Sequence, residues 1–198
     1  YTSTDNTTVY VYQYTGAGGG LLAPSAATCG YAANPSITAE NGTVAITYRD
    51  FYSNDRVYTK IYGTDLTWAD VSPAGCSSSG GAIVEFHGGQ LYLLTSGTQG
   101  NLLYRRDSVS GAWTQLGGAY ASGSVIDQQL CFAGDIPCVL YKSSTSQQTV
   151  SKLEAKQLIG GTFVPMGQYL ASDKGIVSPR LHIYNGNLYA AYLSGDSY

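Results

Sequence analysis

The chain has 198 residues, enough for one domain with a sizeable core, and only 12% of them are charged, where about a quarter is usual. The net charge is −3 and basic residues are scattered, so we expect neither nucleic acid nor an anionic membrane surface as a partner. No apolar run approaches the roughly 20 residues that insertion into a membrane requires. Abundant Ser, Thr, Gly and Tyr with few Lys favour an extracellular, secreted protein.

The N-terminal part predicts two strands, over 8–14 and 20–24. The first of them alternates along the chain in the way that is typical of a strand. A glycine-rich stretch, Gly16–Leu21, leads from one to the other and looks like a phosphate loop. No helix follows it, so we interpret it as a flexible link.

From residue 31 onward the sequence repeats. Each copy has a short apolar strand, a two-residue turn and a second strand rich in apolar and aromatic residues. The turns are Asn41-Gly42, Gly88-Gly89, Gly134-Asp135 and Asn185-Gly186. Asn-Gly and Gly-Gly favour tight hairpins because both central residues of such a turn need a positive φ. The pattern therefore predicts four β-hairpins.

Two further strands complete the copies. The third strand is predicted over 57–62, 102–106 and 150–158, although the last of these segments is also compatible with a short helix. We place a strand there because the repeat requires one. The fourth strand is short and carries one large aromatic residue. These residues are Trp68, Trp113 and Phe163.

The last copy stops after its second strand, and the two N-terminal strands supply the missing pair. The turns recur at steps of 47, 46 and 51 residues. We therefore predict one all-β domain over residues 1–198, a four-bladed β-propeller of four-stranded antiparallel blades whose N-terminal strands complete the C-terminal blade and close the ring. The predicted blades cover about 31–76, 77–120, 121–170, and 176–198 together with 1–28.

The repeat as a whole runs from a strand through Asn-Gly, a Tyr-rich strand and a third strand to a Gly that precedes Trp. It resembles the propeller repeats of fungal and bacterial lectins and related secreted surface proteins. The resemblance covers the whole chain as a pattern and implies the propeller fold. Those lectins usually have more blades, so no sugar-binding residue is carried over to this chain.

The four cysteines predict two disulfides. Cys131 and Cys138 flank one turn symmetrically, so they lie opposite each other in a hairpin. Cys29 and Cys76 are 47 residues apart, one step of the repeat, and are predicted to join equivalent positions of neighbouring blades. The alternative is buried free thiols. Disulfides would place the protein in an oxidising compartment.

Two sequons predict glycosylation, at Asn6 and at Asn41. Both asparagines fall in predicted loops or turns, where a glycan is accessible. Asn41 also has a complete structural explanation, because it is the first residue of a predicted Asn-Gly turn.

The motifs of the commonest catalytic sites are absent. The sequence has no Gly-x-Ser-x-Gly, His-Glu-x-x-His or Cys-x-x-Cys. His87 and His182 are interpreted as a solvated turn residue and a strand residue with a partner. We therefore predict no catalytic residue, no cofactor and no metal site, and no enzymatic activity.

Two pairs of carboxylates are candidates for the alternative, an enzymatic site. Glycoside hydrolysis needs two carboxylates across a sugar, and Asp50 with Asp55, or Asp65 with Asp70, are close in sequence. Spacing does not show whether either pair faces a cleft. The loop from Asp50 to Asp55 also offers oxygen ligands for Ca²⁺, but we interpret it as a plain polar loop.

The predicted function rests on the aromatic residues. Aromatic faces stack on sugar rings, although recurrent aromatics also pack between blades. We predict a non-enzymatic, extracellular, glycan-binding (lectin-like) propeller. The alternative is a structural or adhesive subunit of an extracellular assembly or filament, so the expected partners are glycans or copies of the chain. The candidate ligand contacts are Trp68, Trp113, Tyr58, Tyr62, Asp50 and Asp55.

Overall fold

The protein is seen in a computed structural model that describes most of the chain. The described residues are 8–15, 18–21, 27–28, 31–63, 65–97, 99–144, 151–168, 170–172, 176–184 and 187–194.

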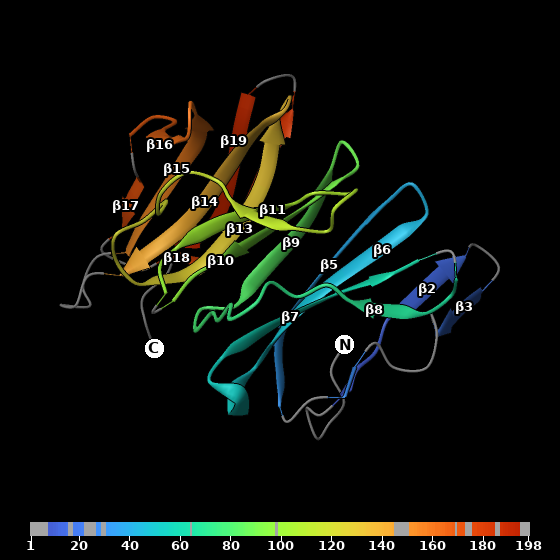
Figure 1. Ribbon diagram of the computed structural model, residues 1–198. Helices are drawn as coiled ribbons and strands as arrows, with labels where there is room; N and C mark the ends of the chain where they lie inside the picture. Colours follow the sequence, from blue (N-terminus) through green and yellow to red (C-terminus); the bar gives the residue numbers. More distant parts are fainter. Residues whose placement is uncertain are drawn as a thin grey trace.

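The first two blades are regular four-stranded antiparallel sheets (Figure 1). The first blade contains β5 (Ala32–Glu40), β6 (Thr43–Asp50), β7 (Arg56–Tyr62) and β8 (Trp68–Asp70), with the short 3-10 helix Phe51–Ser53 after β6. The second blade contains β9 (Ala82–His87), β10 (Gln90–Thr95), β11 (Leu102–Arg106) and β12 (Trp113–Gln115). In each sheet the strands lie side by side in chain order, as the hairpin pattern predicts.

The third blade follows the same order. It contains β13 (Val125–Ala133), β14 (Ile136–Ser144), β15 (Ser151–Ile159) and β16 (Thr162–Pro165). The segment that was also compatible with a helix is therefore a strand. A fifth strand, β17 (Leu170–Ser172), pairs with the start of β15.

The two ends of the chain supply the remaining strands. The C-terminal end gives β18 (Ile176–Tyr184) and β19 (Asn187–Ser194). The N-terminal end gives β1 (Thr8–Val9), β2 (Tyr12–Thr15), β3 (Gly18–Leu21) and β4 (Ala27–Thr28). Within the described residues, β18–β19, β2–β3 and β1–β4 are separate two-stranded sheets. The predicted all-β fold, a four-bladed propeller of antiparallel blades, is confirmed.

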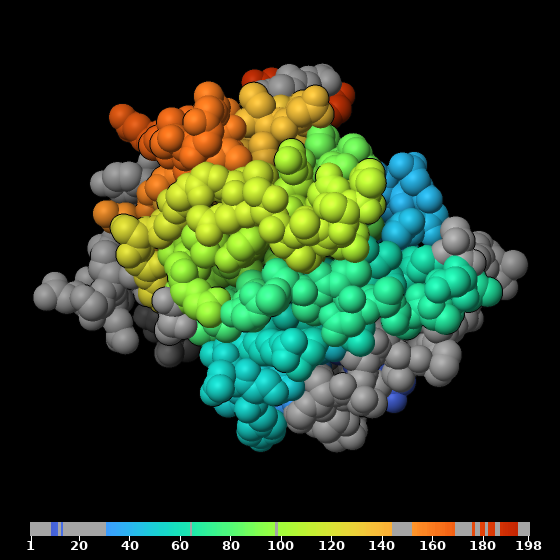
Figure 2. Space-filling model, viewed as in Figure 1, coloured from blue at the N-terminus to red at the C-terminus, as the bar shows by residue number. Residues whose placement is uncertain are grey.

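The core lies between the blades rather than inside any one of them. Leu94 of the second blade clusters with Val139 and Tyr141 of the third. Ala45 of the first blade clusters with Val84 of the second. Burial of a large apolar side chain contributes roughly 1.5–3 kcal/mol, so side-chain packing holds neighbouring sheets together. Figure 2 shows the first three blades as one continuous surface.

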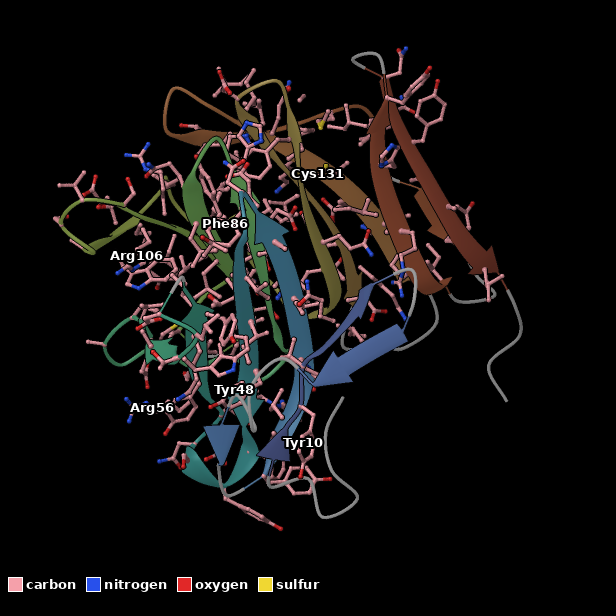
Figure 3. The ribbon with its side chains drawn as sticks, turned by 90° about the vertical axis from the view of Figure 1, so that its right-hand side faces the viewer. Tyr10, Tyr48, Arg56, Phe86, Arg106 and Cys131 are labelled. Carbon is pink, nitrogen blue, oxygen red and sulfur yellow. The ribbon has the colours of Figure 1, made fainter. Side chains whose placement is uncertain are left out.

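The N-terminal segment packs against the first blade. Val9 and Val11 are buried in one cluster with Ile46 and Tyr48. Figure 3 shows β2 in front of the first blade, with Tyr48 labelled. No helix in the described part of the chain is long and apolar enough to cross a membrane.

Candidate functional site

The first strands of all four blades meet around one cavity, which we call the axial pocket. It has a volume of about 320 Å³ and is lined by residues of β5, β9, β13 and β18 and the segments before them. Its polar lining side chains belong to Asn34, Ser36, Asp127, Gln128, Gln129 and Arg180. These residues span 147 positions of the chain, and only the ring brings them together.

Backbone irregularities recur at the level of the axial pocket. The ladder register shifts between Ala33 and Ser36 in β5, between Val125 and Asp127 in β13, and between Val177 and Arg180 in β18. A bulge bends a strand and aims a side chain away from the regular alternation. Three of the four inner strands therefore depart from ideal geometry where they line the same cavity.

In the second blade a glycine, and not a bulge, lies beside the axial pocket. Gly81 lies just before β9 with φ 91°, a region that L side chains rarely adopt. A Cβ on Gly81 would lie 3.2 Å from the Cβ of Asn34. Asn34 itself has φ 51°, which is uncommon for a residue other than glycine. A side chain at residue 81 would therefore be strained and would crowd Asn34.

The four blades contribute equivalent backbone positions to the axial pocket, but the side chains at those positions differ in their chemical groups. The residue five places before the first turn residue is Ser36, Ile83, Gln129 and Arg180 in the four successive blades, and all four line the pocket. Equivalent positions therefore supply a hydroxyl, an alkyl group, an amide and a guanidinium. A ligand surrounded by four different groups is held in one orientation.

Two opposite charges are present in the axial pocket. The carboxylate of Asp127 lies 3.8 Å from Nζ of Lys142, its neighbour across β13 and β14. The guanidinium of Arg180 is exposed and donates one hydrogen bond, of 3.0 Å, to the carbonyl of Pro179. A guanidinium has five N–H donors, so others are available to a ligand.

A buried hydrogen-bond network supports the floor of the axial pocket. Gln128 is 7% exposed, and its Nε2 donates to the carbonyl of Gly81 over 2.9 Å. Its Oε1 accepts from the hydroxyl of Tyr120, which also lies 3.1 Å from the carbonyl oxygen of Thr95. Burial raises the pKa of Tyr120, so the hydroxyl stays a neutral donor. The network ties the bulge of β13 to the segment before β9.

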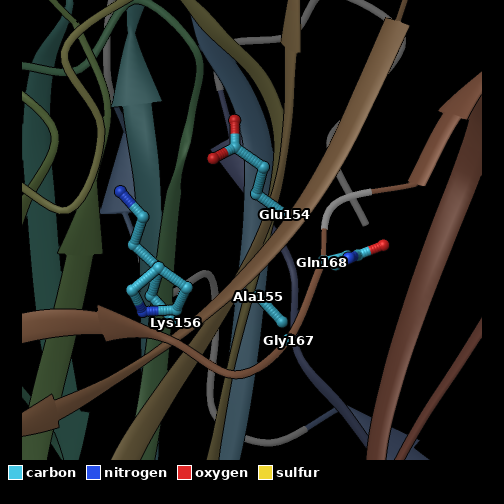
Figure 4. A pocket seen from close by; sticks show the side chains of 6 residues that line it. Glu154, Ala155, Lys156, Gly167 and Gln168 are labelled. Carbon is cyan, nitrogen blue, oxygen red and sulfur yellow. The ribbon is translucent and has the colours of Figure 1, made fainter.

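Another cavity, of about 510 Å³, lies beside β15 (Figure 4). Its two charged residues already have partners inside the protein. Glu154 accepts from the hydroxyls of Tyr141, at 3.0 Å, and Ser143, at 3.3 Å. Lys156 donates to the carbonyl of Tyr120 over 2.7 Å. The axial pocket is the stronger candidate because its Arg180 guanidinium is exposed, whereas both charges of this cavity are bound to other protein groups.

Two more cavities have no charged residue among the described residues that line them. One, of about 540 Å³ between the second and third blades, is lined by Gly, Ser, Ala, Asn and Val residues without a charge. The other, of about 610 Å³, lies between the N-terminal strands and the first blade and is mostly apolar.

The tryptophans predicted as ligand contacts pack against neighbouring residues. Trp68 is half-buried, with its ring 5.1 Å from that of Tyr62. Trp113 packs against the clusters between the first and second blades, and its Nε1 donates to the carbonyl of Val71 over 2.5 Å. Phe163 likewise packs against the core between the second and third blades. The alternative that the sequence left open, packing between blades, describes their contacts.

The other residues predicted to contact a ligand also have partners inside the protein. Tyr58 stacks on Tyr48 with ring centroids 5.4 Å apart. Asp50 is buried and accepts from the backbone N–H groups of Tyr31 and Tyr52. Asp55 lies 3.6 Å from the guanidinium of Arg49. None of these residues, nor Tyr62, lines the axial pocket.

The cysteines and sequons are described in part. Cys131 and Cys138 are directly opposite in the β13–β14 ladder, as the symmetric spacing predicts. Both are thiols here, as is the buried Cys76, so the disulfides remain predictions. Asn41 is exposed in its turn with φ 49°. Cys29 and Asn6 lie outside the described residues.

The residues of the axial pocket were not predicted from the sequence. Asn34, Gln129 and Arg180 belong to no motif and differ from blade to blade. The available signal was positional, because the innermost strand of each blade precedes a recognisable turn. Alignment of the four copies on that turn identifies the equivalent positions.

Among solved structures the chain has similar folds. No protein-family model matches the chain, and no curated protein matches it. The chain is similar to an α-L-arabinofuranosidase, CtGH43, from Clostridium thermocellum ATCC 27405, with 15% sequence identity and a TM-score of 0.48. The match covers 85% of this chain and 66% of that one, slightly under two thirds.

This comparison corrects the function predicted from the sequence. The similar structure is that of an enzyme, which runs against the prediction of a non-enzymatic, lectin-like protein. The error came from treating a propeller with aromatic residues as a binding module, although one fold hosts many functions. At 15% identity we transfer neither the activity nor the substrate of that enzyme.

Proposed function

We propose that the axial pocket binds a small molecule that carries a carboxylate with hydroxyl or amino groups beside it. The observation that carries this proposal is the set of four different side chains at equivalent positions around one cavity, Ser36, Ile83, Gln129 and Arg180. A purely structural channel has no need for such differences, whereas an oriented ligand does.

The charges of the axial pocket define the ligand class. Arg180 presents a planar fork of donors that matches the two oxygens of a carboxylate. Asp127 accepts hydrogen bonds from a hydroxyl or ammonium group on the same ligand. The amides of Asn34 and Gln129 can donate and accept. A hydroxy acid or an amino acid satisfies all of these groups.

The size of the axial pocket agrees with a small ligand. Its volume of about 320 Å³ lies at the lower end of the range for small-molecule sites, roughly 300–1,000 Å³. The strained backbone of Asn34 and the three bulges are features that concentrate at binding sites.

Calorimetric titration with L-malate and L-glutamate, and with their uncharged amides, tests the proposal. We expect the acids to bind and the amides to bind much more weakly. Arg180→Gln should weaken acid binding by about tenfold or more, equivalent to about 1.4 kcal/mol. Arg105→Gln is the matched control, because it removes the same charge from an exposed position on β11.

Equal binding by the two variants, or by acids and amides, would show that the axial pocket is not a carboxylate site. The same mixtures followed over time by NMR report whether a bound acid is also converted.

A further inference from the structure

Cys131 and Cys138 face each other inside the third blade, in the hairpin of β13 and β14. The thiol of Cys131 donates to the carbonyl of Cys138 over 3.8 Å, and the thiol of Cys138 donates to the carbonyl of Ile136 over 3.5 Å. Cys138 is fully buried, whereas Cys131, which is labelled in Figure 3, is half-buried. The pair is therefore in contact, and a small molecule can reach it through Cys131.

The register of the hairpin shows which kind of pair the cysteines form. The turn Gly134-Asp135 is closed by Ala133 opposite Ile136, and in a two-residue hairpin the closing pair is hydrogen-bonded. The next pair, which contains Pro137, is then non-hydrogen-bonded, as a residue without an N–H requires. Cys131 and Cys138 consequently form a hydrogen-bonded pair.

This position makes a disulfide feasible but strained. The Cβ atoms of directly opposite residues are about 4.5–5.5 Å apart, and the hydrogen-bonded pairs are the wider ones. A relaxed disulfide needs about 3.5–4.5 Å between Cβ atoms. Closing the bond has to pull the two strands together against their ladder, and strained disulfides are the ones that are readily reduced.

We propose that Cys131 and Cys138 are a reversible redox pair, a modification site for low-molecular-weight disulfides of the glutathione class. The thiolate of Cys131 attacks one sulfur of the small disulfide, and one thiol is released with a proton. The thiolate of Cys138 then attacks the Cys131 sulfur of the mixed disulfide and releases the second thiol. In total two protein thiols are oxidised, one protein S–S bond forms, and the small disulfide is reduced to two thiols.

Cys76 provides an internal contrast. It is 3% exposed and lies in an apolar cluster with Val57, Ala82 and Leu93. Burial raises the pKa of Cys76 to about 11, and the neighbouring Cys138 together with burial raises the pKa of Cys131 as well, so Cys76 differs from Cys131 in its exposure and not in its acidity. The same reagent should leave Cys76 unmodified in the folded protein.

The test uses the full chain in the background Cys29→Ser/Cys76→Ser, so that only this pair remains. The folded protein is equilibrated with glutathione buffers of increasing oxidised fraction, quenched in acid, unfolded and alkylated with N-ethylmaleimide. We expect loss of both alkylation sites together, loss of two hydrogens in the intact mass, and one peptide link from Cys131 to Cys138. Excess reduced glutathione should restore both sites.

Two single variants separate the steps. Cys138→Ser should stop at a persistent mixed disulfide of glutathione with Cys131. Cys131→Ser should leave Cys138 unmodified, because its sulfur is buried. The proposal is overturned if oxidised wild type contains no Cys131–Cys138 link. It is equally overturned if the link survives millimolar reduced glutathione in the folded protein, because the bond is then a permanent structural disulfide.

Discussion

At the scale of single residues, the side chains that look most functional in the sequence have partners inside the fold, some between blades and some within one blade. The indole N–H of Trp113, on the second blade, donates to the carbonyl of Val71, just after the first. Asp50 accepts from the backbone at the start of the 3-10 helix. Aromatic residues with a polar group are useful in such places because they bury area and still satisfy a hydrogen bond.

The buried thiol of Cys76 makes stability depend on pH. Burial raises its pKa from 9.0 to about 11. Above pH 9 the unfolded chain loses this proton first, so deprotonation favours unfolding and stability falls as pH rises to about 11. We expect the stability difference between wild type and Cys76→Ala to fall by about 1 kcal/mol per pH unit in this window.

Urea unfolding with reductant present, between about pH 8 and pH 10, measures this difference. A difference that does not change with pH would mean that folding does not raise the pKa of the Cys76 thiol.

At the scale of elements, the inner strands combine regular ladders with local irregularity. β5, β13 and β18 keep normal antiparallel pairing over most of their length and shift register only beside the axial pocket. The regular parts hold the strands rigidly, and the bulges direct side chains into the cavity. The second blade has Gly81, and not a bulge, at the corresponding place beside the axial pocket.

Gly81→Ala should therefore disturb both the fold and the axial pocket. The new Cβ would stand 3.2 Å from the Cβ of Asn34 on a backbone with φ 91°. We expect a loss of stability of about 1–3 kcal/mol and weaker binding of the acid ligands. Chemical denaturation and calorimetry measure the two effects.

Gly118→Ala is the matched control, because nothing lies within 4 Å of its Cβ position and its φ is not positive. If both variants behave alike, the close approach of Gly81 to Asn34 has no energetic importance.

At the scale of the whole molecule, side chains of one blade accept hydrogen bonds from backbone N–H groups of the next blade. Alternate residues of β5 accept hydrogen bonds from N–H groups at and beyond β9. Ser36 accepts from Val84 at 3.3 Å, Thr38 from Phe86 at 3.1 Å and Glu40 from Gly89 at 2.7 Å. The inner edge of the second blade is thus covered, as exposed sheet edges need to be.

Thr38→Val should weaken the contact between the first and second blades. It removes the acceptor of the Phe86 N–H and leaves that group without this bond in a buried place. We expect a destabilisation of about 1–3 kcal/mol and faster hydrogen exchange at the Phe86 amide. Thr114→Val, an exposed residue of β12, is the control and should be nearly neutral. Unchanged exchange at Phe86 would refute the bridging role.

Much of the fold was predictable because its signals are local. The Asn41-Gly42 turn has φ values of 49° and 78°, as its residue types require. The opposition of Cys131 and Cys138 followed from their distance to one turn. The bulges at Asn34 and Arg180 were not predictable, because a register shift depends on what packs against the strand.

The sequence by itself determined the hairpins, their order and the number of blades, since turn chemistry and period-2 alternation act between near neighbours in the chain. Only the tertiary structure decided which polar and charged side chains come together around one cavity. Asn34, Asp127 and Arg180 are distant in sequence and belong to no motif, and they line one cavity because the ring places four inner strands around a common axis. It also decided that Trp68 and Trp113 pack between neighbours, because the same aromatic face suits a ligand or a blade.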